Sequence, residues 1–295
     1  MIVFVIRVLG VVPLSALRAL GAGAGAIAAL FGTPWRRTTE INLGIAFPDL
    51  DRHARAALTR RSLIESGKTI AEIPAIWSGK RAYVEHLVER VSGMAAIEAG
   101  SRTGRGVIVA LPHLGSWEIL LCYLSVHHRV SVLYKAPSPP ELAPFVEAAR
   151  SRFGATMIAA IAGAARPLQT VLREGGIVLV APDQAPNPGF GVFARFFGLK
   201  TNTMHMVPRL AAKTQASVVF GWAERLPWGG GFHVHFEPAE DDVNHPDLER
   251  AAAAMNRDIE RCIRRCPTQY LWSYKRFRFN LPGIPSPYPR RRRRP

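Results

Sequence analysis

The sequence predicts an α/β fold: a single domain with a mixed, largely parallel sheet flanked by helices, and an N-terminal membrane-anchoring helix. From residue 106 onward, short β-rich runs alternate with helical stretches, an order typical of strands joined by crossover helices. Residues 1–31 are apolar apart from Arg7 and Arg18. We therefore expect an anchor over 1–31, one folded domain over 32–289 and a basic tail over 290–295.

The N-terminal segment is long enough to cross a bilayer if its two arginines are tolerated. Arg7 and Arg18 are eleven positions apart, so both lie on one stripe of a helix and the rest of its surface can face lipid. Pro13 and the weakly hydrophobic run over 21–29 favour an interfacial or snorkelling helix over a clean central span. The alternative is a signal peptide cleaved within that run of small residues.

Hydrophobic periodicity sets the expected elements in order. Residues 51–77 carry apolar side chains at helical intervals, with Asp49 or Asp51 as the cap. The elements expected after this helix are strand 107–111, helix 117–126, strand 130–134, helix 141–153, helix 165–173, strand 177–181, helix 204–213, strand 217–222, an antiparallel strand 232–236 and helix 246–265.

Polar side chains follow three of these strands directly. His113 follows the first strand, Lys135 the second, and Asp183 and Gln184 the strand over 177–181. In open α/β sheets, ligands bind beyond the carboxyl ends of the strands. We therefore expect these polar groups to converge at one edge of the sheet.

The motif over 113–118 places His113 in a strand-to-helix turn and Glu118 in the first turn of the helix that follows, with Ser116 as a plausible N-cap. A histidine can take a proton from an alcohol near neutral pH, and a carboxylate beside it would fix its tautomer. The helix N-terminus adds a positive dipole end that could stabilise an oxyanion. Taken alone, the pair is more simply interpreted as a loop histidine with a capping acid.

A Ser or Cys nucleophile in a strained glycine elbow does not accompany the pair. Direct attack by an acceptor hydroxyl therefore fits better than a covalent acyl-enzyme.

Four blocks of sequence resemble the lipid A biosynthesis acyltransferase family, the late lauroyl and myristoyl transferases of Gram-negative bacteria. The blocks are 113–118 (His, four residues, an acid), 172–184 ending in Asp-Gln, 191–198 with Thr203 beyond it, and 272–277. They occur in the expected order and span nearly the whole chain. The resemblance implies that an acyl chain passes from acyl carrier protein, or CoA, to a hydroxyl of an anionic glycolipid, most simply a lipid A precursor.

Carried over residue by residue, the resemblance implies that His113 is the general base and Glu118 its partner. It also implies acceptor-binding or orienting roles for Lys135, Arg166, Asp183 and Gln184. Phe193 and Phe197 lie among phenylalanines and glycines in an expected loop, where they could line an acyl tunnel or belong to the core. The chain departs from the family at Lys135, where arginine is usual, and at Met206, where glycine is frequent, so another glycolipid or phospholipid acceptor stays open.

The formal net charge of +16 predicts an anionic partner, and eight cations lie after residue 273 with no acid among them. Arg36 and Arg37 follow the apolar segment, which indicates the cytoplasmic face of the inner membrane. A tethered, non-enzymatic protein that binds nucleic acid is the remote alternative. It leaves the motifs unexplained and lacks aromatic residues within the arginine run, so we expect no nucleic acid.

No cofactor or metal is expected from the sequence. His233 and His235 share a face of a strand, but two histidines without a third ligand nearby in the sequence do not predict a zinc site. Cys122, Cys262 and Cys266 are too few for a disulfide framework, and we expect reduced, packed thiols.

Overall fold

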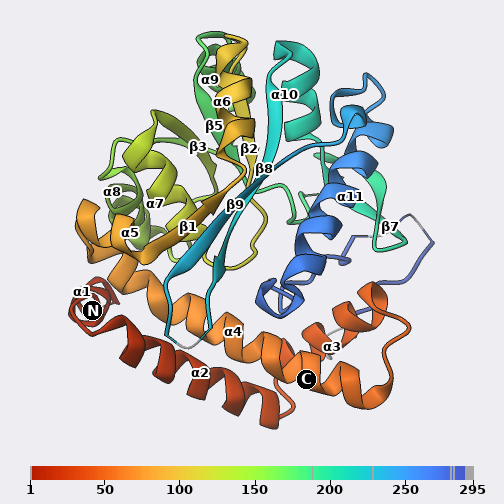
Figure 1. The fold of residues 1–295 in the computed structure, drawn as a ribbon. Helices are drawn as coiled ribbons and strands as arrows, with labels where there is room; N and C mark the ends of the chain where they lie inside the picture. The colour runs from red at the N-terminus through yellow and green to blue at the C-terminus, as the bar shows by residue number, and fades with distance from the viewer. Residues whose placement is uncertain (1, 188, 228, 280, 282, 290–295) are drawn as a thin grey trace.

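A seven-stranded sheet runs through the middle of the computed structural model, which describes residues 2–289 except 188, 228, 280 and 282 (Figure 1). The strand order is β1-β9-β8-β2-β5-β3-β4. The strands are β1 (Val88–Ser92), β2 (Val107–Ala110), β3 (Val130–Tyr134), β4 (Thr156–Ala159), β5 (Ile177–Val180), β8 (Ser217–Arg225) and β9 (Phe232–Pro238). All neighbours are parallel except β8 and β9, which are antiparallel. The mixed, largely parallel sheet is therefore confirmed.

Helices flank this sheet, as expected. They are α1 (Ile2–Leu9), α2 (Leu14–Leu30), α3 (Pro34–Ala46), α4 (Arg52–Ser78), α5 (Arg81–Leu87), α6 (Met94–Arg102), α7 (Trp117–His127), α8 (Ala143–Ser151), α9 (Ala165–Arg173), α10 (Met206–Thr214) and α11 (Leu248–Arg265). The cap of α4 is Asp51, whose side chain accepts the Ala54 N–H at 2.7 Å.

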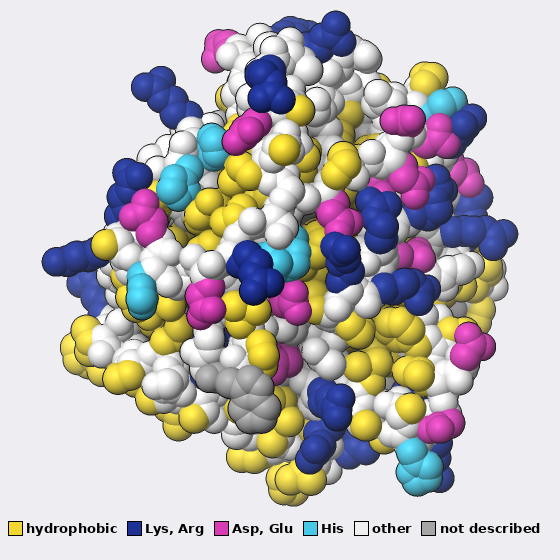
Figure 2. Space-filling view, viewed as in Figure 1, with side chains coloured by type: hydrophobic (Ala, Val, Ile, Leu, Met, Phe, Trp, Pro, Cys, Tyr) yellow, Lys and Arg dark blue, Asp and Glu magenta, His cyan; other side chains and the backbone are white. Residues whose placement is uncertain are grey.

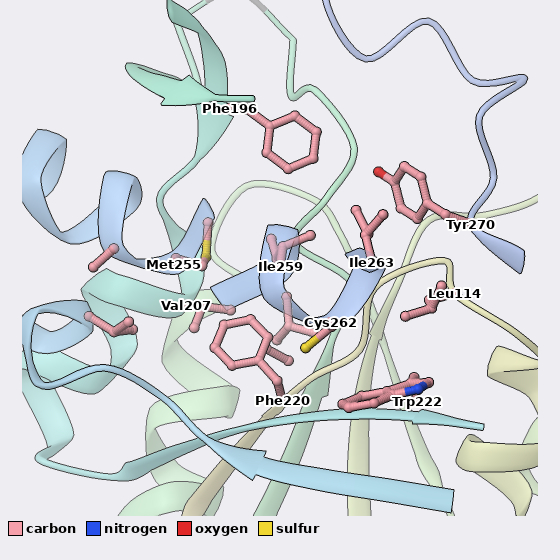
Figure 3. Close-up of a cluster of buried hydrophobic side chains, with 14 of the residues drawn as sticks. Leu114, Phe196, Val207, Phe220, Trp222, Met255, Ile259, Cys262, Ile263 and Tyr270 are labelled. Atoms are coloured by element: carbon pink, nitrogen blue, oxygen red, sulfur yellow. The ribbon is translucent and has the colours of Figure 1, made fainter. Parts of the chain in front are cut away.

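The central strands are apolar on both faces because helices cover both. In β2, Ile108 and Ala110 face one core and Val107 and Val109 the other. The first core lies between the sheet and α11, where Figure 3 shows side chains of the helix above those of β8. Cys262 belongs to this core, and all three cysteines are buried free thiols, which confirms their expected packing role.

The N-terminal segment differs from the single helix expected over 1–31. It forms two helices, α1 and α2, separated at 10–13, where Pro13 lacks the N–H that a continuous helix would use. No single helix in the described part of the chain is long and apolar enough to cross a membrane; α2 and α3 reach that length and composition only as a pair bent by 78°.

Small residues bring α2 against α4. A Cβ on Gly21 would lie 2.4 Å from the Gly67 carbonyl oxygen, and one on Gly25 would lie 2.3 Å from the Leu63 oxygen. The Gly-Ala run that weakened the membrane signal therefore serves close helix packing. Sequence periodicity could not show this helix contact, because the second helix lies about forty residues further along the chain.

Arg18 faces the protein and not the bilayer interface that the arginine stripe predicted. It is 8% exposed and pairs with Glu72 of α4, while its guanidinium donates to the Gly230 carbonyl. The outer surface of α1 and α2 is apolar, and Figure 2 shows hydrophobic side chains along the lower left edge where these helices lie. Its most exposed members are Phe4, Val11, Leu20, Ile27, Leu30 and Phe31.

The loop expected over 191–198 is instead part of a β-hairpin, β6 (Gly191–Phe196) and β7 (Leu199–Met204), which packs against α11. The hairpin was not predicted because β7 is polar. Its buried Thr201, Asn202 and Thr203 find hydrogen-bond partners in Asn256, Arg276 and the Phe279 carbonyl, which tertiary structure alone supplies. The basic tail over 290–295 lies outside the described residues.

Candidate active site

The turn between β2 and α7 holds the proposed base, and β8 fixes its shape. Gly115 has a φ of +63°, and a Cβ there would lie 1.9 Å from the Ala223 carbonyl oxygen. Only glycine fits both conditions. The Ser116 N–H donates to that same oxygen at 2.8 Å, and the Gly115 N–H to the Gln269 oxygen at 3.0 Å. The motif therefore needs its glycine because the turn lies directly on a neighbouring strand.

Asp183 holds His113 by two hydrogen bonds. Since β2 and β5 are parallel neighbours with Ala110 opposite Val180, the residues that follow them meet at one edge. His113 Nδ1–H donates to Asp183 Oδ1 at 2.8 Å, and the His113 backbone N–H donates to Oδ2 at 3.0 Å. A carboxylate on Nδ1 leaves the lone pair on Nε2, the nitrogen that can accept a proton. The predicted convergence is confirmed for these two residues.

Burial and charge act in opposite directions on this pair. Burial lowers the pKa of His113, but the negative charge of Asp183 and its hydrogen bond outweigh burial and raise that pKa above its ordinary 6.5. Burial likewise raises the pKa of Asp183, which is 2% exposed, yet the imidazole and backbone hydrogen bonds bring it below its ordinary value. Asp183 is therefore ionised at neutral pH.

Gln184 and Trp117 complete the surroundings of the imidazole. The Gln184 amide nitrogen lies 3.3 Å from His113 Nε2, within hydrogen-bond distance of the nitrogen that carries the lone pair. The Trp117 ring meets the imidazole edge to face, with centroids 5.1 Å apart. The two contacts restrain the ring at the edge of the sheet, and Gln184 also converges on His113 as expected.

Glu118 is not the carboxylate on His113 Nδ1, which corrects the pairing expected from the motif. It is 1% exposed and accepts hydrogen bonds from the Arg150 Nε–H at 3.2 Å and the Trp77 indole N–H at 2.8 Å. Position 118 lies on the first turn of α7, where its side chain faces α4 and α8. Ser116 is the N-cap residue, but its side chain makes no capping hydrogen bond.

The other expected binding residues lie on other elements of the fold. Lys135 is exposed just beyond β3, at the same edge of the sheet, and Arg166 is exposed on α9. Phe193 is partly buried in β6. Phe197 is buried against Phe47 and Trp272, with centroids 5.8 Å away in each case. It also borders a groove of about 380 Å³ between the end of α3 and α11.

Comparison with known proteins decides the family. The model of the bacterial lipid A biosynthesis acyltransferases matches residues 1–279. The chain belongs to this family, and it is an acyltransferase. It is 25% identical to the lipid A biosynthesis lauroyltransferase of Escherichia coli K12, over 94% of this chain and 90% of the relative. It is 27% identical to the palmitoleoyltransferase of the same strain (94% and 89%) and 25% identical to its myristoyltransferase (90% and 82%).

Arg150 and Trp77 contact Glu118, and the sequence did not reveal either contact. Burial lowers the pKa of Arg150, but the Glu118 carboxylate outweighs it and raises that pKa, so the guanidinium stays charged. Arg150 is one of 38 lysines and arginines in the chain and carries no local signal. Trp77 was visible only as the end of an amphipathic helix.

A buried ion-pair network extends from the turn that holds His113 to the N-terminal helices of the acyltransferase. Arg225 of β8 donates to Glu72 at 2.6 Å and to Thr69 at 2.7 Å, both on α4, and Thr69 donates in turn to the Gly115 carbonyl at 3.4 Å. Glu72 also pairs with Arg18 of α2. The turn that carries His113 is therefore tied to α4 and, through it, to α2.

Proposed function

We propose that this acyltransferase moves a fatty acyl chain from an acyl carrier protein or CoA thioester to a hydroxyl of an anionic glycolipid, with a lipid A precursor as the natural acceptor. The observation that carries the proposal is the histidine at the carboxyl edge of the sheet whose Nδ1–H is fixed by a buried, ionised carboxylate. The names of the relatives support acyl transfer to lipid A.

His113 Nε2 takes the proton of the acceptor hydroxyl as its oxygen attacks the thioester carbonyl. The tetrahedral intermediate collapses by breaking the carbon–sulfur bond, and the thiolate recovers the proton from the imidazolium. Asp183 stabilises that imidazolium, since its charge already raises the pKa of His113. The N-terminus of α7 directs its dipole toward the developing oxyanion.

The cations at the sheet edge suit the phosphates of such an acceptor. Lys135 and Arg166 are exposed and bind them in this proposal, while Gln184 orients the hydroxyl at Nε2. Glu118 positions the histidine turn through α7, with its own charge balanced by Arg150. Phe193 contacts the acyl chain, and Phe197 borders the groove between α3 and α11.

In this proposal the enzyme binds the cytoplasmic face of the membrane, and the apolar outer surface of α1 and α2 supports membrane binding. Six large side chains on this surface are more than half exposed, which a monomer in water would leave unfavourably hydrated. The ion-pair network behind α2 holds that surface at a fixed position relative to His113. An acceptor in the lipid layer can thus reach the site without leaving the membrane.

One reconstitution tests the reaction. Purified protein in lipid vesicles is incubated with acyl carrier protein thioesters or acyl-CoA, and with a lipid A precursor, a mannosylated phosphoinositide or a lysophospholipid as acceptor. Products are identified by mass. His113→Ala should form no product, while His53→Ala, at an exposed position of α4, should behave as wild type. If product formed only on another acceptor, the lipid A precursor would not be the natural acceptor. Full activity of His113→Ala would contradict the proposed role of this histidine as the base.

A further inference from the structure

A second histidine-containing cluster lies on the sheet away from the His113 hydrogen bonds. His233 and His235 alternate with apolar residues along β9 and so share one face. In the antiparallel register with β8, Glu224 lies directly opposite His233. One ligand atom from each of these three side chains lies within 4.8 Å of the others. The neighbouring strand therefore supplies a third donor, which could not be identified from residues close to the histidines in the sequence.

We propose that Glu224, His233 and His235 bind a divalent transition-metal ion, with Zn²⁺ preferred. Two imidazoles and one carboxylate form a donor set that Zn²⁺ favours, and they leave a fourth position open to water. Mg²⁺ and Ca²⁺ prefer oxygen ligands throughout and should bind poorly here.

Neighbouring side chains hold the two imidazoles in place. The Trp222 ring stacks on His235 with centroids 4.6 Å apart and planes 8° from parallel. The Ser92 hydroxyl of β1 lies 2.8 Å from His233 Nε2. Such outer contacts fix ring orientation and tautomer in metal sites. Three strands therefore contribute to a site whose ligands are largely positioned before an ion binds.

The proposed metal site includes a residue of β8, the strand that also contacts the turn holding His113. Glu224 directly follows Ala223, whose carbonyl oxygen accepts the Ser116 N–H. A bound ion would join β8 to β9 beside this contact, so we expect it to stabilise the fold.

Metal binding can be measured on the full-length protein in detergent after removal of metal with a chelator. Dialysis against about 10 μM Zn²⁺, followed by gel filtration and elemental analysis, should give about one Zn²⁺ per chain. Co²⁺ should give the visible absorption of a four-coordinate site. Glu224→Gln and His233→Asn should weaken binding at least 10-fold, whereas the exposed His53→Asn should not.

The proposal is overturned if wild-type protein retains no stoichiometric Zn²⁺, or if the cluster variants bind it as wild type does. Should a variant fail to fold by circular dichroism, the wild type still decides the question. Zn²⁺ should raise its Tm and protect His233 and His235 from diethyl pyrocarbonate, read by mass spectrometry. Equal modification with and without Zn²⁺ would reject the site.

Discussion

Asp183 does two things for His113: it selects the tautomer with the lone pair on Nε2, and it stabilises the protonated ring. A backbone hydrogen bond to the second carboxylate oxygen fixes the carboxylate itself. The two residues therefore form one functional unit, and their substitutions should not act additively.

His113→Ala and Asp183→Asn should each lower kcat by roughly 10² or more, and the double variant should be little worse than His113→Ala. The reason is that Asp183 acts only through the imidazole. Single-turnover rates with saturating donor measure this. Strictly multiplicative losses would show that Asp183 acts on the substrate independently of the histidine.

The direction of the pKa shift of His113 determines how kcat/KM depends on pH. The base works only when neutral, and Asp183 raises the pKa of His113, so kcat/KM should fall as the pH drops through a value above 6.5. In Asp183→Asn the charge is gone while burial, which lowers the pKa, is still present. The acid limb of its residual activity should move to lower pH. If the acid limb of the pH profile did not move, the group that titrates there would not be His113.

Glu118 and Arg150 should affect stability as well as rate. Glu118→Leu leaves the Arg150 guanidinium without its buried partner and should lower the free energy of unfolding by about 3 kcal/mol, because an uncompensated charge remains. Adding Arg150→Leu should restore much of that loss without restoring activity. Thermal unfolding of both variants tests this, and equal Tm values for the single and double variants would contradict it.

At the scale of elements, the contact between α2 and α4 decides where the N-terminal helices lie. Glycines on both helices allow backbone to meet backbone, and the buried pair Arg18–Glu72 closes the same interface. The apolar side of α2 is thereby left on the outside. The position of this surface follows from the helix interface and not from hydrophobicity alone.

Gly21 and Gly23 make a matched pair of tests on α2. A Cβ at Gly21 would lie 2.4 Å from the Gly67 oxygen, whereas one at Gly23 meets nothing within 4 Å. Gly21→Ala should therefore destabilise the protein by about 1–3 kcal/mol through helix separation. Gly23→Ala should be neutral or stabilise by up to about 1 kcal/mol through helix propensity. Thermal unfolding in one detergent compares them, and a similar Tm for both would refute the close contact.

At the scale of the whole molecule, the apolar surface of α1 and α2 should govern membrane binding. Replacing Leu20, Ile27 and Phe31 by serine removes about 1.5 kcal/mol of lipid contact each, so vesicle partitioning should fall by more than about 10². Their exposure means that the Tm should hardly change. Ile161→Ser, exposed on the loop after β4, is the control. If the triple variant co-sedimented with vesicles as wild type does, this surface would not be the membrane-binding surface.

Local pattern was enough for five strands of the main sheet, for the capped start of α4 and for the position of His113 at a strand end; these strands are β2, β3, β5, β8 and β9. Apolar periodicity and a cap depend on neighbours within a few residues, so the sequence determines them. By contrast, α3 and the β6–β7 hairpin escaped prediction because their polar residues are satisfied only by distant partners, such as Asn42 by the Trp272 and Tyr274 carbonyls.

Which side chains meet was decided by the tertiary structure alone. The motif paired His113 with Glu118 five residues away, but the order of β2 and β5 in the sheet brought Asp183, seventy residues away, onto Nδ1. Arg18 looked like a residue of a lipid-facing helix until α4 supplied Glu72. Register between β8 and β9 likewise set Glu224 beside two histidines. Such contacts depend on strand order, register and helix packing, which short-range patterns do not encode.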